Sequence, residues 1–253
     1  MSLIRTERQG AVARLLLDSP ANRNALSAQL RAELYQALRD AGDDDGVRSI
    51  VLGHTGPVFC AGADLKEMRS GPPAPDTPTV AQILAEIWRT PKPVVAALAG
   101  AARAGGLGLV AACDIVIASD TISFACTEVR IGVIPAVISA VLAPRMSPAA
   151  MHQLFLTAEP FSAQWAQQAG LVELIVQPEQ LDTETRRITD AFALAAPGAL
   201  AGTKRLTRSA KAIADLETRL GDLEQLSTRY FESAEGREGL AAFAAKRPPS
   251  WAC

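Results

Sequence analysis

Short apolar runs alternate with amphipathic stretches over most of the chain. Residues 11–18 read as a strand, and in the stretch 27–41 leucines recur every four residues from Leu30 to Leu38, which predicts a helix capped by Ser27. The same order of strand and helix recurs. Further strands are predicted at 48–54, 93–99, 114–118 and 122–125. Apolar strands that alternate with helices predict an α/β fold whose sheets are covered on their faces.

The pattern changes after about Pro178, where strand signals end and only helical periodicity remains. Proline and glycine punctuate this part at Pro197, Gly198, Gly221 and Gly239. The final helix, G-R-E-G-L-A-A-F-A-A-K-R, is predicted to end at Pro248. Its Leu240 and Phe243 form an apolar stripe that packs either on the chain's own core or on another subunit.

One segment favours neither helix nor strand. Residues 71–78, G-P-P-A-P-D-T-P, contain four prolines in eight positions. Proline removes backbone donors and restricts its neighbours, so the segment is predicted to be an exposed, mobile loop.

Composition and charge narrow the classes of partner. The 253 residues are 49% hydrophobic but only 5% aromatic, which predicts a large aliphatic core, and the net charge of -2 leaves no basic field for nucleic acid. No stretch is long and apolar enough to span a membrane, and M-S-L-I-R-T-E-R does not resemble a signal peptide. A soluble cytoplasmic protein is expected, with neither nucleic acid nor membrane as a partner.

Cysteine and histidine are few and scattered. Cys60, Cys113, Cys126 and Cys253 show no metal-ligand spacing with His54 or His152, so no metal site is predicted. The cysteines are expected to be small buried apolar residues. A thiol nucleophile formed by Cys60 with His54 is a weaker alternative, because their spacing does not ensure contact.

Two strand-to-helix junctions carry the candidate chemistry. In C-A-G-A-D-L-K-E-M, Asp64 is placed to cap a helix that begins at Leu65, with Glu67 completing a capping box. In R-A-G-G-L-G-L (103–109), a helix follows a strand directly. Both junctions leave backbone N–H groups unpaired at a helix N-terminus, and two such groups that converge would form an oxyanion hole.

Two other interpretations of these junctions remain open from the residues alone. Both turns could be ordinary tight turns. The stretch from Gly106 through Gly108 to Ala111 also fits G-x-G-x-x-A, a dinucleotide fingerprint, with Asp120 as the ribose ligand. The helix before the strand at Asp114 is too short for that fingerprint.

Six motifs, in order, resemble the crotonase, or enoyl-CoA hydratase/isomerase, superfamily over essentially the whole chain. They are P-A-N-R-N-A-L-S (20–27), F-C-A-G-A-D-L-K-E-M (59–68), P-K-P-V-V-A-A-L-A-G-A-A-R-A-G-G-L-G-L (91–109), A-C-D-I-V-I-A (112–118), F-A-C-T-E-V-R-I-G-V-I-P (124–135) and F-S-A-Q-W-A-Q-Q-A-G-L-V (161–172). The resemblance implies a spiral of repeated ββα units over 1–195 that holds an acyl-CoA site. It also implies a helical segment over 196–253 used for trimerisation, a homotrimer or dimer of trimers, and no cofactor beyond the CoA of the substrate.

The resemblance also assigns roles to particular residues. The backbone N–H groups of Ala63 and Gly105 would hold the thioester oxygen, and Gly106 and Gly108 would let the helix pack closely beneath it. The substrate-binding positions it implies are Arg23, Ala25, Ala61, Asp64, Leu65, Lys66, Arg103, Gly108 and Lys246. Of these, Arg103 would meet a substrate carboxylate or a CoA phosphate, and a plain surface arginine is the alternative.

Carboxylates in this superfamily come from two positions, and this chain has one of them. Glu128 matches the first, whereas Gly108 stands where the second would be. A lone glutamate is ordinarily a solvated surface residue. Here Phe124, Val129, Ile131, Val133 and Ile134 surround Glu128 in the sequence, and this apolar setting is expected to raise its pKa.

Three functions follow as hypotheses. The first is hydration of a 2-enoyl-CoA by Glu128 and water, which agrees with a resemblance to bacterial enoyl-CoA hydratases of the methylglutaconyl-CoA hydratase type. The second is isomerisation of a double bond, for which one carboxylate suffices. The third is an acyl-CoA binding protein that has lost turnover with the second carboxylate.

Overall fold

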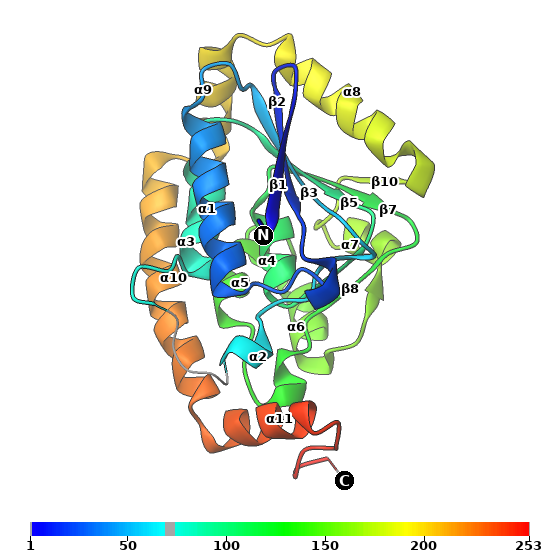
Figure 1. The fold of residues 1–253 in the computed structure, drawn as a ribbon, viewed down its shortest axis with the longest axis vertical. Coiled ribbons are helices and arrows are strands. Elements are labelled where there is room, and N and C mark those ends of the chain that lie inside the picture. The colour runs from blue at the N-terminus through cyan, green and yellow to red at the C-terminus, as the bar shows by residue number, and fades with distance from the viewer. Residues whose placement is uncertain (1, 69–73, 253) are drawn as a thin grey trace.

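A computed structural model describes residues 2–68 and 74–252 (Figure 1). The segment predicted to be an exposed, mobile loop, 71–78, lies partly outside these residues; in its described part, 74–78, residues 74–76 are exposed and 77–78 are half-buried.

A six-stranded sheet forms the centre of the molecule, in the order β1-β2-β3-β5-β7-β10. Its strands are β1 (Ile4–Gln9), β2 (Val12–Leu17), β3 (Ser49–His54), β5 (Val94–Leu98), β7 (Ile115–Ser119) and β10 (Leu174–Val176). β1 and β2 form an antiparallel hairpin, and every later neighbour is parallel. The predicted strands within 11–18, 48–54, 93–99 and 114–118 are confirmed. β1 was missed because its sequence, I-R-T-E-R-Q, is mostly polar, as an edge strand permits.

A smaller sheet of four strands has the order β4-β6-β8-β9. Its members are β4 (Val58–Cys60), β6 (Ala101–Arg103), β8 (Ser123–Ala125) and β9 (Phe161–Ser162). The first three are parallel, and β9 joins antiparallel to β8. β8 confirms the predicted strand at 122–125, whereas β4, β6 and β9, each of two or three residues, were not predicted.

The two sheets arise from one repeated unit. β3, β5 and β7 lie side by side in the large sheet, and the strands that follow them, β4, β6 and β8, lie side by side in the small sheet. A helix then returns the chain to the next unit. This repetition is the ββα spiral expected from the sequence.

Eleven helices are present in the described part of the chain. Seven belong to the first 168 residues: α1 (Ala28–Asp43), α2 (Leu65–Met68), α3 (Val80–Arg89), α4 (Gly105–Ala112), α5 (Ala136–Leu142), α6 (Pro148–Thr157) and α7 (Ala163–Gln168). The remaining four follow β10: α8 (Leu181–Ala193), α9 (Pro197–Thr207), α10 (Ala210–Phe231) and α11 (Ala234–Ala244). Three short 3-10 helices are η1 (Pro20–Asn22), η2 (Glu128–Ile131) and η3 (Pro178–Gln180). The part after residue 178 is helical as predicted.

Both faces of the large sheet are covered. Buried side chains of α1, α3 and α4 join the main core on one face, and Ser27 caps α1 as predicted by accepting a hydrogen bond from the Leu30 N–H at 3.3 Å. On the other face, Val51, Val95 and Ile117 pack beneath α8. Parallel strands buried on both faces explain why their sequences read as continuous apolar runs.

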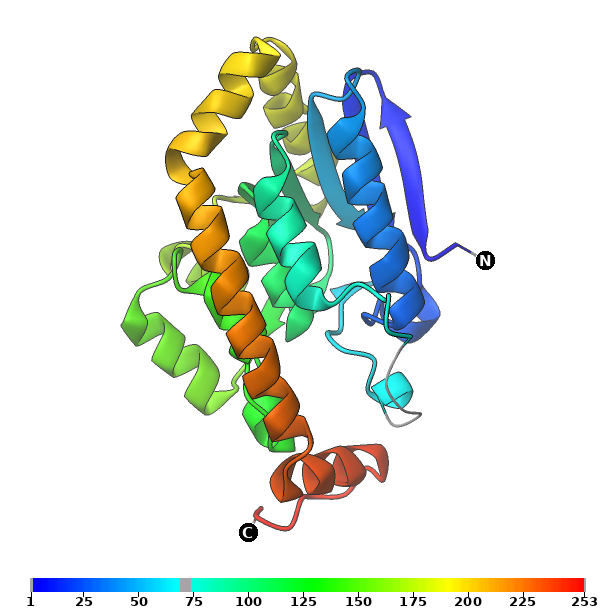
Figure 2. The same ribbon diagram turned by 90° about the vertical axis from the view of Figure 1, so that its left-hand side faces the viewer.

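The C-terminal helices run along the outside of the spiral. Figure 2 shows α10 crossing beside α3, and the two helices contact each other. Leu216 and Leu220 of α10 belong to the main core. α11 then turns beneath the molecule and contacts η2, so it packs on its own chain in the described structure. The division at residue 195 stays a prediction.

Candidate active site

A cavity of about 220 Å3 lies where the two glycine turns, η2 and the C-terminal helices meet. Most of its wall is aliphatic or aromatic. The lining residues are Leu26, Ala61, Ala63, Leu65, Val80, Ala104, Gly105, Thr127, Glu128, Ile131, Val133, Ile134, Pro135, Ala136, Val137, Ile138, Ser227, Phe231 and Phe243. The predicted residues Ala63, Gly105 and Glu128 are thus brought together at one cavity.

The first glycine turn joins β4 to α2. Gly62 has φ +90°, a left-handed conformation that favours glycine, and a Cβ there would lie 2.7 Å from the Ala104 Cβ of the second turn. The Gly62 carbonyl accepts a hydrogen bond from the Leu26 N–H at 2.8 Å. These contacts fix the turn and leave the next N–H, that of Ala63, beside the cavity.

The second glycine turn joins β6 to α4. Ala104 precedes the helix with φ 47° and ψ −122°, an uncommon conformation for a residue with a Cβ. The strain is located where Gly105 begins α4. A Cβ at Gly105 would lie 4.0 Å from the Ala63 backbone nitrogen, so the two turns bring their backbones close together.

The N–H groups of Ala63 and Gly105 are available to a ligand. No described residue accepts a backbone hydrogen bond from either of them. Gly105 is the first residue of α4, where the N–H has no partner within the helix, and Ala63 lies two residues before α2. The α4 dipole adds partial positive charge at the same point. Two free N–H groups on one cavity wall can both donate to a single oxygen atom that carries negative charge.

Gly106 explains how α4 approaches β4. A Cβ at Gly106 would lie 2.6 Å from the Cys60 Cβ and 2.7 Å from the Cys60 carbonyl oxygen. Since both atoms are buried and fixed, only glycine fits here. The predicted close packing is confirmed for Gly106.

Glu128 begins η2 and faces the cavity from an apolar surrounding. Its Oε2 is buried and has no hydrogen-bond partner in the described structure. Burial raises the pKa of the Glu128 carboxyl to about 7, and a hydrogen bond from its own backbone N–H only partly opposes this. The expected rise in pKa is confirmed. The carboxyl can therefore take up or release a proton near neutral pH.

Gly108 does not line the cavity. A Cβ at this position would lie 2.7 Å from the Ile138 Cγ2 and 3.6 Å from the Leu84 Cδ1. The place of a second carboxylate is therefore occupied by packing between α4 and Ile138 of α5. A side chain at 108 would first meet Ile138, which itself lines the cavity; the close packing expected at Gly108 is thus confirmed, and its role in substrate binding stays a prediction.

The other predicted substrate-binding residues lie in different places. Ala61 and Leu65 line the cavity, and Ala25 is buried. Asp64 caps α2 as predicted, accepting from the Lys66 and Glu67 N–H groups at 3.0 and 3.1 Å.

The predicted cations do not line the cavity. Arg23, Lys66 and Lys246 have exposed side chains, and Lys246 lies three residues beyond Phe243 of the cavity wall. Arg103 is half-buried and donates to the Ser123 carbonyl and hydroxyl at 2.5 and 2.7 Å. Its guanidinium therefore ties β6 to β8, and its contact with a substrate carboxylate or a CoA phosphate stays a prediction.

Two local expectations need correction. The Glu67 carboxylate does not complete a capping box with Asp64, because its Oε2 accepts from the Ala28 N–H at 2.7 Å and so caps α1. The thiol alternative also fails. Cys60 is fully buried, and burial raises the pKa of its thiol to about 12, so it is not a thiolate near neutral pH.

Sequence reasoning missed the far wall of the cavity. Ile138 of α5 and Ser227 and Phe231 of α10 line it, although no motif or spacing links them to the glycine turns. Phe243 was noted only as part of an apolar stripe. The signal for Ile138 was present in the apolar run that follows Pro135, but only packing shows which of its residues face inward.

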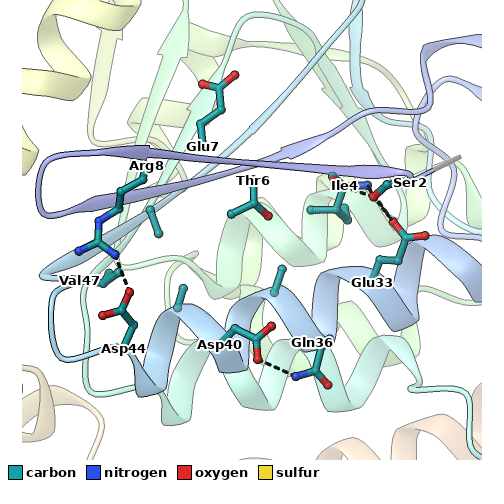
Figure 3. Close-up of a pocket in the computed structure, with 13 residues that line it drawn as sticks. Ser2, Ile4, Thr6, Glu7, Arg8, Glu33, Gln36, Asp40, Asp44 and Val47 are labelled. Atoms are coloured by element: carbon teal, nitrogen blue, oxygen red, sulfur yellow. Dashed lines mark hydrogen bonds and ion pairs between the residues drawn. The ribbon is translucent and has the colours of Figure 1, made fainter.

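A second cavity, of about 400 Å3, lies between the β1–β2 hairpin and α1 (Figure 3). Glu7, Glu33, Asp40 and Asp44 line it, and Arg8 is paired with Asp44 at 2.5 Å. It is larger, but its acidic wall disfavours an anion. The smaller cavity is the one that joins free N–H donors to a group with a shifted pKa, and we therefore take it as the candidate active site.

Neither a metal cluster nor a membrane span is found in the part of the chain that the structure describes. No three His, Cys, Asp or Glu residues there are grouped to hold a metal ion. Among the described helices, none is long and apolar enough to cross a membrane. Cys60, Cys113 and Cys126 are free and buried, as expected.

Fold and site together define a class of enzyme. The chain matches the family Enoyl-CoA hydratase/isomerase over residues 7–253, and it belongs to that family within the crotonase superfamily. The dinucleotide interpretation of the glycines is thereby set aside.

Individual relatives show how broad this family is. The structure of an enoyl-CoA hydratase from Mycobacterium avium is 40% identical with a TM-score of 0.87, covering 99% of both chains. The carnitinyl-CoA dehydratase of Proteus mirabilis is 33% identical over 96% of this chain and 95% of that protein. A methylmalonyl-CoA decarboxylase in complex with 2-nitronate-propionyl-CoA is 27% identical with a TM-score of 0.85, covering 98% of both chains.

Proposed function

We propose that this enzyme hydrates a 2-enoyl-CoA thioester, with Ala63 and Gly105 as oxyanion donors and Glu128 as acid and base. The observation that carries the proposal is the meeting of two free N–H groups and one desolvated carboxyl at a single apolar cavity. Addition of water to an enoyl thioester places negative charge on the thioester oxygen and requires proton transfer at C2. The cavity supplies a group for each need.

One carboxylate can complete the reaction. Ionised Glu128 takes a proton from water as the water oxygen bonds to C3, and the C2=C3 electron pair moves onto the thioester as an enolate. The N–H groups of Ala63 and Gly105 stabilise that oxygen. The protonated Glu128 then gives its proton to C2, so that one water is added and the carboxylate is restored.

Isomerisation is the second candidate, and the packing at Gly108 favours it. Because Ile138 fills that place, Glu128 is the only carboxylate among the described lining residues. A single carboxylate can remove a proton from C2 of a 3-enoyl-CoA and return it to C4. The relatives named as hydratase and dehydratase keep hydration as the first proposal.

Binding of the CoA portion and assembly are part of the same proposal. Arg23, Lys66 and Lys246 are exposed cations that we assign to the phosphates of CoA. The resemblance further suggests a homotrimer or a dimer of trimers in the cytoplasm. Light scattering at several protein concentrations tests the assembly, and a stable monomer would contradict it.

A panel of 2-enoyl and 3-enoyl CoA esters in D2O, followed by NMR, tests the reaction. A 3-hydroxyacyl product with deuterium at C2 supports hydration. Migration of the double bond without water addition supports isomerisation instead. Tight binding without either product would contradict both and identify an acyl-CoA binding protein.

A further inference from the structure

α11 rests on η2 through direct contact of their backbones. A Cβ at Gly239 would lie 2.1 Å from the Ile131 carbonyl oxygen and 2.7 Å from the Ile131 Cα. From the other side, a Cβ at Gly132 would lie 2.5 Å from the Glu235 carbonyl oxygen. Backbone atoms cannot rotate away as a side chain can, so the two elements fit only while both positions are glycine.

The turn that α11 contacts is the one that begins at Glu128. Ile131 is the last residue of η2, and the Glu128 carbonyl accepts hydrogen bonds from the Gly132 and Val133 N–H groups, the latter at 3.2 Å. Gly132 ends the turn with φ +70°. Because the turn is so short and closed on itself, a shift of Ile131 is transmitted to the backbone that carries the Glu128 carboxyl.

The same helix also covers the cavity. Phe243 lies four residues after Gly239, so the two share one face of α11. Phe243 lines the cavity although 54% of its surface is exposed, which places it at the rim. α11 therefore contacts η2 through Gly239 and reaches the rim of the cavity through Phe243.

Interactions beyond the cavity hold the end of α11. Arg247 binds both carboxylate oxygens of Glu238, at 2.7 and 2.8 Å, and the Ser250 N–H donates to Glu238 at 2.9 Å. The Arg247 guanidinium, with the Ser250 N–H, lowers the pKa of Glu238 to about 2. This pair fastens the tail to the helix.

We propose that α11 is the positioning element for Glu128, with Gly239 as a positioning residue and Phe243 as the lid that keeps water from the carboxyl. The proposal rests on the proposed role of Glu128 as acid and base. It assigns to the C-terminal helix the positioning of Glu128 and the exclusion of water from its carboxyl.

Charged neighbours do not account for the state of Glu128. The charged and titratable residues on the elements packed against η2 and at the end of α10 include Arg130 on η2 itself, Glu235, Arg237 and Glu238 on α11, His152 on α6, Arg229 on α10 and Glu232 just after it. Burial and its own N–H are the causes found for the shifted pKa of Glu128, and the Cys126 thiol, buried beside it, is neutral. Water access is therefore the variable that α11 controls.

Gly239→Ala tests this contact, with Gly221→Ala as its matched control. A Cβ at Gly221 meets nothing within 4 Å, so the same substitution in α10 has no contact to disturb. The pKa of Glu128 is measured directly by 13C NMR of the side-chain carboxyl, and the pH dependence of kcat/KM is recorded in parallel. In Gly239→Ala the pKa of Glu128 is expected to fall by about one unit or more toward its ordinary value, because water reaches the carboxyl. The midpoint of the pH dependence of kcat/KM should fall with it. Gly221→Ala should match the wild type.

Phe243→Ala keeps the test decisive if Gly239→Ala does not fold, because its side chain is half-exposed and its loss only opens the rim. It should shift the Glu128 pKa in the same direction. An unchanged Glu128 pKa in the folded variants would overturn the proposal. The two claims are tested by different measurements. A wild-type rate in Glu128→Gln would refute the proposed function. The NMR titration needs no turnover, so it still tests whether α11 sets the pKa of Glu128.

Discussion

Positions 128 and 108 are the two places from which the crotonase resemblance draws its carboxylates, and this chain treats them in opposite ways. At 128 a glutamate faces the cavity with a pKa raised to about 7 by burial. At 108 a glycine lies under Ile138 with no room for a Cβ. Acid and base capacity is thus concentrated in one group, and its efficiency depends on how well that group is desolvated.

Glu128→Gln is the substitution with the largest expected effect. If Glu128 is the acid and base, kcat should fall by roughly 10² to 10⁴, as is typical for a positioned proton-transfer group. Steady-state kinetics measure this, and binding of a CoA thioester should change little. A variant that retains most of its turnover would remove position 128 from the mechanism.

Gly105→Pro tests the proposed oxyanion donor, the Gly105 N–H, which would stabilise the enolate in any reaction that Glu128 catalyses. Proline deletes this N–H at the first residue of α4, where a helix tolerates it, so kcat should fall on the order of 10² or more. Circular dichroism must show an intact fold, because the ring also approaches Leu26 and follows the strained Ala104. Wild-type turnover in a folded variant would contradict a two-donor oxyanion site.

The pH dependence of the wild-type enzyme sharpens the description of position 128. Hydration begins with ionised Glu128, whose pKa is about 7. The value of kcat/KM should therefore rise with pH, level off above about 7, and be about tenfold lower one unit below that midpoint. The fold is checked across the range by circular dichroism. A midpoint near the ordinary glutamate value would mean that the carboxyl is solvated.

Gly108→Glu tests position 108 and should have the smallest direct effect on the reaction. The new Cβ would overlap Ile138, so the variant should lose about 1 to 3 kcal/mol of unfolding free energy, and hydration and isomerisation should fall together. Urea unfolding and the NMR assay measure these changes.

The double variant Gly108→Glu with Ile138→Ala is the control, because it removes the Ile138 side chain that the new glutamate would overlap. It should recover stability relative to Gly108→Glu and raise hydration relative to isomerisation. Increased hydration in Gly108→Glu alone would show that Ile138 yields easily and that only the carboxylate was missing.

Local patterns predicted much of the architecture. Ser27 and the leucines of α1, the apolar runs of β2, β3, β5 and β7, and the helical end after residue 178 were all read from periodicity and capping. β1 was missed because its edge sequence is mostly polar. Of the strands with only two or three residues, β8 was predicted, whereas β4, β6, β9 and β10 were missed because so short a run carries little periodic signal. The family resemblance, not periodicity, gave the spiral.

The candidate site was predicted in part. Glu128, Ala63 and Gly105 stand in recognisable motifs, and all three line one cavity. Arg103 and Gly108 do not line this cavity, since Arg103 hydrogen-bonds Ser123 and Gly108 packs on Ile138, and their expected roles at the substrate stay predictions. Their sequence positions are right next to the site, but the direction in which a residue faces depends on neighbours that are distant in the chain.

The sequence by itself singled out the candidate backbone donors and the one candidate carboxyl, because glycine turns, helix starts and an apolar neighbourhood are properties of a few consecutive residues. Only the tertiary structure decided that α5 fills the second carboxylate position and that α10 and α11 close the cavity. Those outcomes come from contacts between segments some 30 to over 100 residues apart, such as Gly108 with Ile138 and Ile131 with Gly239. Burial is a sum over all such contacts, and this is why the pKa of Glu128 is set by the whole fold.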